Sequence, residues 1–172
     1  MDQKKRIILV GFMGSGKTNF GKKLANKLNL SFIDSDLEIE LNENRSINQI
    51  FEEDGEESFR KLEQVFIQNL IQSEDSFILS TGGGLPCFED NMNRLNELGT
   101  TIYLELSPKA LLKRLENGLE HRPLLRNLNE GELLKYIETK LSERSPFYQK
   151  AKIVQPGLSL NSKAIKALLE KI

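Results

Sequence analysis

The sequence has almost none of the side chains that build disulfides and transition-metal centres. Cys87 is the only cysteine and His121 the only histidine in 172 residues. One cysteine cannot form an internal disulfide, and a zinc site needs several Cys or His ligands at set spacings. The composition therefore excludes a disulfide framework and a zinc centre of this kind, and nothing in it indicates an oxidising compartment.

An excess of charge of one sign and a long apolar run are also absent. Lys and Arg number 24 and Asp and Glu 25, so no large basic field is available to hold a nucleic acid. The start, MDQKKRIILVG, leads from a basic run directly into a glycine-rich loop, and it fits neither a secretory signal nor a membrane span. We expect a soluble, cytoplasmic protein that binds neither nucleic acid nor membrane. No obvious apolar surface stripe is present, so we expect a monomer.

Short β-rich runs alternate with longer segments of helical period, which is typical of an open parallel sheet covered by helices. The length suits one domain. We predict a single α/β domain over residues 1–172, a three-layer α/β/α sandwich with a five-stranded parallel sheet and three helices between the second and third strands. The predicted strands are Arg6–Val10, Ser31–Ile33, Phe77–Ser80, Thr100–Leu106 and Ile153–Val154.

A glycine-rich motif, GFMGSGKT at Gly11–Thr18, follows the first predicted strand and begins the first predicted helix. It matches the phosphate-binding loop of P-loop NTPases at every fixed position. Glycines let backbone N–H groups wrap a phosphate, Lys17 would reach the β- and γ-phosphates, and the Thr18 hydroxyl would ligate Mg²⁺. The alternative is a glycine turn without a ligand, but such a turn does not require Lys-Thr after its last glycine. The predicted ATP contacts here are Gly14, Ser15, Gly16, Lys17, Thr18 and Asn19.

Two carboxylates, Asp34 and Asp36, follow the second predicted strand. In extended backbone, residues two apart lie on the same side. One carboxylate could hold Mg²⁺ through water while the other accepts a hydrogen bond from an alcohol that receives the phosphoryl group. Of the two, Asp34 is the better candidate for the metal. Asp36 could instead, or in addition, be the N-cap of the helix that follows.

Three consecutive glycines, Gly82, Gly83 and Gly84, follow the third predicted strand. Ligands of such sheets bind at the carboxyl ends of the strands, and each glycine costs conformational entropy on folding. Close approach of a ligand to bare backbone would explain the three glycines. A merely permissive turn is the alternative.

Four arginines could complete the site: Arg60, Arg114, Arg122 and Arg144. Glu63 lies three residues after Arg60, so an ion pair within one helix could orient that guanidinium toward a carboxylate. Arg122 lies in a polar segment at about residues 116–129 that we predict to be a closing lid, where it could stabilise the transferring phosphoryl group. Each arginine taken alone could equally be a solvated surface charge.

Together these segments resemble the shikimate kinase family over nearly the whole chain. The resemblance implies a sheet of the nucleoside-monophosphate-kinase type, a lid over ATP, and conversion of shikimate to its 3-phosphate on the pathway to chorismate and the aromatic amino acids. The motifs that carry it are Gly11–Thr18, FIDSD at Phe32–Asp36, the segment Ser46–Glu63, STGGG at Ser80–Gly84, RPLL at Arg122–Leu125 and ERSPFY at Glu143–Tyr148.

The resemblance also implies a role for each matched residue. Lys17, Asp36 and Arg122 would be catalytic, and Thr18 and Asp34 would hold Mg²⁺. Shikimate would be bound by a region at about residues 34–63 and by later residues, with contacts from Asp36, Arg60, Gly82, Gly83, Gly84 and Arg144. Arg114 and Arg122 would contact ATP. The match weakens after Lys150, where Gln155 is a further candidate for contact with the nucleotide.

Two other functions remain open from the residues. A gluconate-type or nucleoside-monophosphate kinase would share the phosphate loop and the lid, although the phosphate of a nucleotide acceptor calls for more positive charge and fewer carboxylates. A non-catalytic nucleotide-binding module would keep the phosphate loop but would not need the acidic pair and the three glycines.

Overall fold

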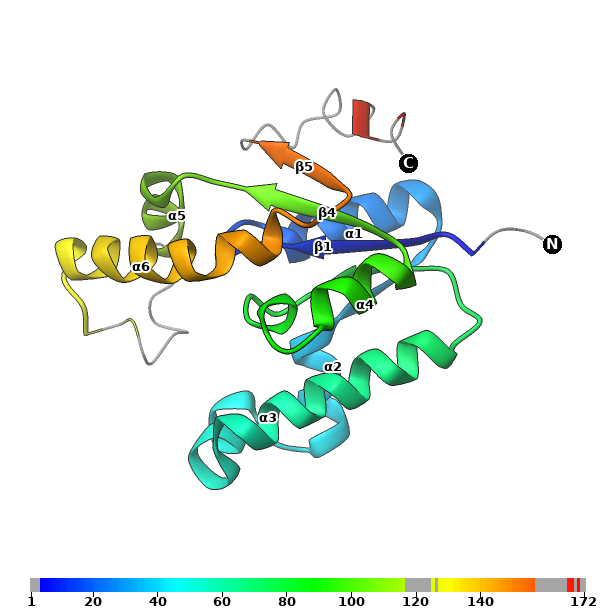
Figure 1. Cartoon of the computed structure of the whole chain (residues 1–172), viewed down its shortest axis with the longest axis horizontal. Coiled ribbons are helices and arrows are strands. Elements are labelled where there is room, and N and C mark those ends of the chain that lie inside the picture. Colours follow the sequence, from blue (N-terminus) through cyan, green and yellow to red (C-terminus); the bar gives the residue numbers. More distant parts are fainter. Residues whose placement is uncertain (1–3, 117–124, 126, 157–166, 169, 171–172) are drawn as a thin grey trace.

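The computed structural model describes residues 4–116, 125, 127–156, 167, 168 and 170 of the chain. Its centre is a five-stranded parallel sheet with the strand order β2-β3-β1-β4-β5 (Figure 1). The strands are β1 Arg6–Val10, β2 Ser31–Asp34, β3 Phe77–Ser80, β4 Thr100–Glu105 and β5 Ile153–Pro156. The predicted count and direction of the strands are confirmed, and each boundary lies within two residues of its prediction.

The sheet is covered on both faces, as the fully apolar strand β1 requires. Ile8 and Val10 pack into the larger core cluster with helices that follow β2 and β4, whereas Ile7 and Leu9 pack against the first helix. This alternation follows from the two-residue period of a strand. The result is the predicted three-layer α/β/α arrangement, in which α1 lies behind the sheet in Figure 1.

The helices of the described part begin and end largely where the sequence signals them. Ser46 forms a capping box with Gln49, and the Ser107 side chain caps the helix that Pro108 begins. The helices are α1 Lys17–Leu28, α2 Ser35–Glu43, α3 Ile47–Gln72, α4 Asn91–Leu98, α5 Pro108–Leu115 and α6 Glu130–Tyr148, with a short 3-10 helix η1 at Leu85–Cys87.

The connection between β2 and β3 contains three helical pieces, because Gly55 interrupts α3 with φ 80° and ψ 172°. Only glycine adopts this conformation readily. The second piece of α3 therefore begins at Glu56 and runs back along the sheet, with Phe59, Phe66 and Leu70 buried. The predicted number of helices in this crossover is confirmed.

No helix in the described ranges is long and apolar enough to cross a membrane. The predicted lid lies largely outside the described residues, which include only Glu116, Leu125 and residues 127–129 of it.

Candidate active site

The phosphate loop joins β1 to α1 with its backbone turned into a cradle. Gly14 and Gly16 have φ values of 79° and 94°, which other residues rarely adopt. The Lys17 Nζ donates to the carbonyl oxygens of Gly11 at 2.8 Å and Phe12 at 3.0 Å. Within the described part of the chain, the buried Ser15 Oγ has no hydrogen-bond partner. A buried hydroxyl without a partner, next to a lysine and a helix N-terminus, suits an incoming phosphate oxygen.

Beside the loop, three oxygen-bearing side chains meet. The Thr18 hydroxyl donates to Asp34 Oδ2 at 2.9 Å and lies 3.4 Å from the Ser80 hydroxyl at the end of β3. Hydroxyl and carboxylate oxygens are the ligands that Mg²⁺ accepts in proteins, so these residues fit the predicted metal. Ser80 was not predicted as a site residue. The one feature of the sequence that could have indicated it is its position at the end of β3, the strand that pairs with β1.

The helix cap at this edge is Asp34, not Asp36. Asp34 Oδ1 accepts from the Asp36 backbone N–H at 3.2 Å, and α2 begins at Ser35. The alternative that Asp36 caps the helix is therefore wrong, and so is the extended backbone expected for the pair. The helix begins earlier because Asp34 ends the strand with a side chain able to cap. Asp34 thus both caps α2 and accepts from Thr18.

Asp36 projects from the first turn of α2 and lines a cavity that Arg60, Arg144 and the three glycines also line. Burial is the main cause that raises the pKa of its carboxyl, and the nearby Asp34 raises it further. Lys17 opposes this shift. A carboxylate that is costly to keep charged binds a hydroxyl proton well, which suits a group that accepts a hydrogen bond from an alcohol.

Two of the three glycines make room for side chains of the site. A Cβ on Gly82 would overlap the Asp36 carboxylate, and a Cβ on Gly84 would lie 2.9 Å from Arg60 Nη1. The sequence predicts that close approach of a ligand requires these glycines. In the structure, the packing of Asp36 and Arg60 already requires glycine at positions 82 and 84. Gly83 is more open, since the nearest atom to its Cβ position is the Met13 backbone nitrogen at 3.3 Å.

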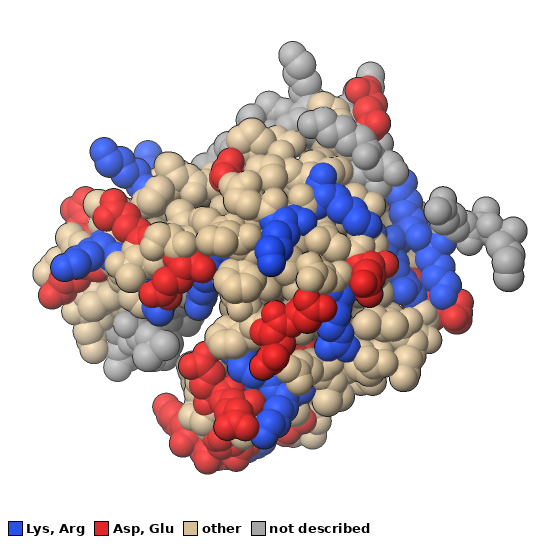
Figure 2. Space-filling model, in the orientation of Figure 1, with Lys and Arg blue, Asp and Glu red and all other residues tan. Residues whose placement is uncertain are grey.

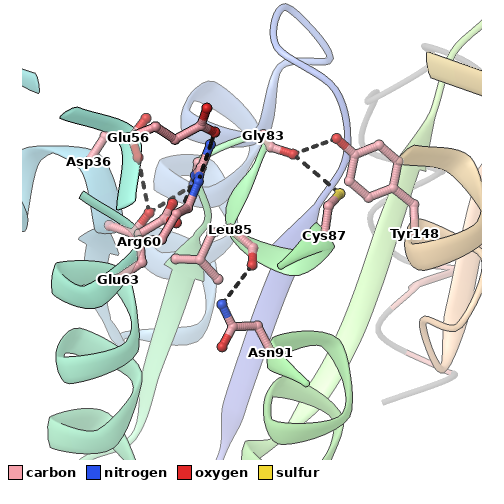
Figure 3. A network of polar contacts seen from close by, with 11 residues as sticks. Asp36, Glu56, Arg60, Glu63, Gly83, Leu85, Cys87, Asn91 and Tyr148 are labelled. Atoms are coloured by element: carbon pink, nitrogen blue, oxygen red, sulfur yellow. Dashed lines mark hydrogen bonds and ion pairs between the residues drawn. The ribbon is translucent and has the colours of Figure 1, made fainter. Parts of the chain in front are cut away.

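Arg60, in the second piece of α3, is held on several sides (Figure 3). Its Nη1 donates to Glu63 at 2.7 Å, and its Nε and Nη2 donate to Glu56 at 3.2 and 2.8 Å. The ring of Phe88 lies under the guanidinium, 3.7 Å from Cζ to the ring centroid. The predicted pairing with Glu63 is confirmed. Glu56 and Phe88 were missed, although the i, i+4 spacing of Glu56 to Arg60 was visible in the sequence.

Arg144 reaches the same site from α6. Its guanidinium lies over the Phe12 ring at 5.7 Å and lines the cavity with Arg60. One helical turn later, the buried Tyr148 hydroxyl donates to the Gly83 carbonyl at 2.5 Å, which ties α6 to the glycine loop (Figure 3). Cys87 also points to this carbonyl, and burial raises the pKa of its thiol to about 11, so it stays protonated at neutral pH.

The cavity between these elements has a volume of about 320 Å³. It opens where the molecule is hollowed between the first turns of α3 and α6 (Figure 2). Two carboxyl groups, from Asp36 and Glu63, and two guanidinium groups line it together with bare backbone. Its lining is Met13, Asp36, Ile47, Asn48, Phe59, Arg60, Glu63, Gly82, Gly83, Gly84, Leu125, Tyr136 and Arg144.

The remaining predicted residues lie as follows. Arg114, in the last turn of α5, donates to the carbonyl oxygens of Gly14 at 3.3 Å and Ser15 at 3.0 Å, so it is in contact with the phosphate loop. Asn19 is exposed in the first turn of α1. Gln155 lies in β5 and donates to the Pro156 carbonyl, so its contact with the nucleotide stays a prediction. Arg122 lies outside the described residues.

Comparisons with known proteins agree with this geometry. The family model described as shikimate kinase matches residues 13–172. A shikimate kinase from Parabacteroides distasonis is 48% identical over 149 residues, which cover 87% of this chain and 86% of that protein.

Two solved structures are similar over almost their full length. The shikimate kinase from Bacteroides thetaiotaomicron has a TM-score of 0.87 and 37% identity, and the match covers 97% of this chain and 95% of that one. The shikimate kinase from Acinetobacter baumannii, solved in complex with shikimate, has a TM-score of 0.81 and 34% identity over 99% and 91% of the two chains. From its motifs, fold and site, and from these matches, the chain belongs to the shikimate kinase family.

Proposed function

We propose that this chain transfers the γ-phosphoryl group of ATP to the 3-hydroxyl of shikimate and releases shikimate 3-phosphate and ADP. The observation that carries the proposal is the composition of the cavity beside the phosphate loop. The cavity presents the Asp36 carboxylate together with the guanidinium groups of Arg60 and Arg144. A small acid that also bears hydroxyl groups matches this set, because guanidinium binds carboxylate and carboxylate binds hydroxyl. The relative from Acinetobacter baumannii was solved with shikimate bound.

The donor and acceptor would lie on either side of the phosphate loop. Lys17 contacts the loop carbonyls directly, and in the complex with ATP its ammonium would turn to the β- and γ-phosphates. Arg114 would lie on the nucleotide side, and Arg122 would approach the transferred group from the lid. Arg60 and Arg144 would hold the shikimate carboxylate, while the glycine loop and Asp36 would hold its hydroxyl groups.

In this reaction the protein acts mainly by positioning the two substrates, and it forms no covalent bond with them. A bond forms between the 3-hydroxyl oxygen and the γ-phosphorus, and the bond from that phosphorus to the bridging oxygen of ADP breaks. Asp36 accepts the hydrogen bond of the hydroxyl and, as the new bond forms, its proton. The raised pKa of this buried carboxyl favours such a transfer.

Thr18 and Asp34 would hold Mg²⁺, with Ser80 beside them, because all three offer oxygen atoms at the edge of the phosphate loop. When bound, the ion would neutralise charge on the β- and γ-phosphates. Asp34 is fixed for this purpose by its cap contact with α2.

The test is ADP release by the purified protein with Mg²⁺ and ATP, measured with shikimate, quinate, gluconate and nucleoside monophosphates in separate reactions. Release that depends on shikimate alone is expected. Release with another acceptor would keep the assignment as a kinase and overturn the assignment of Arg60 and Arg144. Release with no acceptor would favour a nucleotide-binding module.

Cytoplasmic location and a monomeric state are part of the same proposal, and size-exclusion chromatography with light scattering tests the latter.

A further inference from the structure

Arg60 has no open edge in this structure, although the proposed function requires it to receive a carboxylate. A guanidinium has three edges that donate hydrogen bonds in its plane: the side edge of Nε and Nη2, the fork between Nη1 and Nη2, and the back edge of Nη1. Glu56 Oε1 accepts from both nitrogens of the side edge. Glu63 accepts from Nη1.

The fork is closed by backbone. A Cβ on Gly84 would lie 2.9 Å from Nη1, 3.0 Å from Nη2 and 3.3 Å from Cζ. A point at nearly equal distances from the two nitrogens lies in front of the fork, and the Gly84 Cα is one bond length from that point, so the Gly84 backbone faces the fork. One flat face of the guanidinium is covered as well, by the Phe88 ring. An incoming carboxylate can bind with two hydrogen bonds only if one of these neighbours leaves.

The two glutamates differ sharply in how firmly they are held. The Glu63 side chain is 1% exposed, and its pKa is raised to about 7 by burial despite the opposing effect of Arg60. The Glu56 side chain is 57% exposed. An exposed ion pair contributes little to stability, because water solvates the freed carboxylate. Glu56 is therefore the neighbour that can leave at small cost.

The position of Glu56 in the chain also favours its release. It is the first residue after Gly55, where the two pieces of α3 meet, and nothing lies within 4 Å of the Cβ position of Gly55. Glu56 thus lies at a helix end, next to a residue with open space around its Cβ position. Nearby acidic side chains, which are prominent on this tip in Figure 2, include Glu52, Glu53, Asp54 and Glu57.

We propose that Glu56 is a counter-anion of Arg60 that the substrate carboxylate displaces. The inference rests on the proposed function. In the empty enzyme Glu56 closes the side edge of the guanidinium, and the acid binds there by exchange of one carboxylate for another. Glu63 and Phe88 stay in place during the exchange and keep the guanidinium oriented. Glu56 thereby lowers the affinity for the acid and sets the concentration range in which the enzyme responds to it.

The experiment compares Glu56→Gln with the wild type and with Glu57→Gln. Glu57 is a matched control because it forms an i, i+4 ion pair with Lys61 on the same helix and is 84% exposed. Calorimetric titration with shikimate gives Kd, and steady-state assays give KM and kcat. Removing the competing charge is expected to lower Kd and KM for shikimate about two- to fivefold, with kcat within about twofold of the wild type. Glu57→Gln should leave all three constants unchanged.

An unchanged or raised Kd in Glu56→Gln would overturn the inference, because a residue that only orients Arg60 weakens binding when it is removed. Glu56→Ala gives a second variant without any side-chain acceptor and should show the same gain. If the wild type turns over shikimate but Glu56→Gln binds it no more tightly, the displacement of Glu56 is rejected and the proposed function stands. A wild type with no turnover on shikimate would reject the proposed function itself.

Discussion

Gly82 packs so closely against Asp36 that a methyl group on the glycine would overlap the carboxylate oxygen Oδ1. The Gly82 N–H also donates to Ser35 Oγ at 2.8 Å, so the end of β3 and the start of α2 are held together at this point. The position of the Asp36 carboxylate is therefore set in part by a residue that has no side chain.

Replacing Gly82 with alanine tests this relationship. Gly82→Ala must push the Asp36 carboxylate aside, and misplacement of a catalytic group by about 1 Å can cost on the order of 100-fold in rate. We expect kcat to fall about 10- to 100-fold while thermal unfolding shows a folded protein. Gly131→Ala is the control, because its new methyl group would lie 3.5 Å from its nearest neighbour in the described structure, Asn129 Oδ1. Equal kcat in the two variants would argue against the packing role of Gly82.

Asp36 and Lys17 should be needed for turnover and not for folding. Asp36→Asn keeps the shape of the side chain and removes its ability to take a proton, while Lys17→Ala removes the charge next to the phosphates. Loss of one general base contributes typically about 10²- to 10⁴-fold. We expect both variants to lose most of kcat and to keep the wild-type circular dichroism spectrum. Substantial turnover by purified Asp36→Asn would remove this residue from the catalytic role.

Asp34 should govern the response to Mg²⁺. Asparagine is also a good N-cap, so Asp34→Asn keeps the start of α2 and removes the negative charge beside Thr18. We expect the Mg²⁺ concentration for half-maximal activity to rise about tenfold or more. Asp90→Asn, at the N-cap of α4, is the matched control and should respond to Mg²⁺ like the wild type. If the Mg²⁺ concentration for half-maximal activity were the same in Asp34→Asn and Asp90→Asn, Asp34 would not hold the metal.

Glu63 should make stability depend on pH. Its folded-state pKa is raised to about 7 from an ordinary 4.5, mainly by burial. The folded state therefore holds this proton more tightly than the unfolded chain does. The stabilisation is complete below about pH 4.5 and is lost as pH rises through about 7. Between pH 5 and pH 8, we expect the wild type to lose on the order of 3 kcal/mol relative to Glu63→Gln in urea unfolding. Parallel stability profiles of the two proteins would contradict the shift.

Much of the fold could be predicted because local signals agree with the tertiary structure. Each strand of the sheet was predicted, and the caps at Ser46 and Ser107 were visible from the residue types that follow them. The phosphate loop was predicted for the same reason, since its glycines and Lys17 are consecutive in the sequence.

The parts that sequence reasoning missed depend on contacts between distant segments. The role of Gly82 could not be read from a run of glycines, because it depends on a helix that starts more than forty residues earlier, at Ser35. Phe88 looked like an ordinary loop residue, and only folding places its ring under Arg60. The alternative that Asp36 caps α2 was wrong because two candidate caps lie two residues apart, and sequence alone does not say which residue ends the strand.

The strand order has a consequence for how such enzymes can diversify. β1, with the phosphate loop, is the central strand, and most residues that line the proposed acceptor cavity come from α3, the start of α2 and the glycine loop on one side of it. Substitutions in α2, α3 and the glycine loop, together with Arg144 on α6, could thus change the acceptor while the phosphate loop stays the same. A scaffold divided in this way can acquire a new small-molecule specificity through a few local replacements while its energy source stays the same.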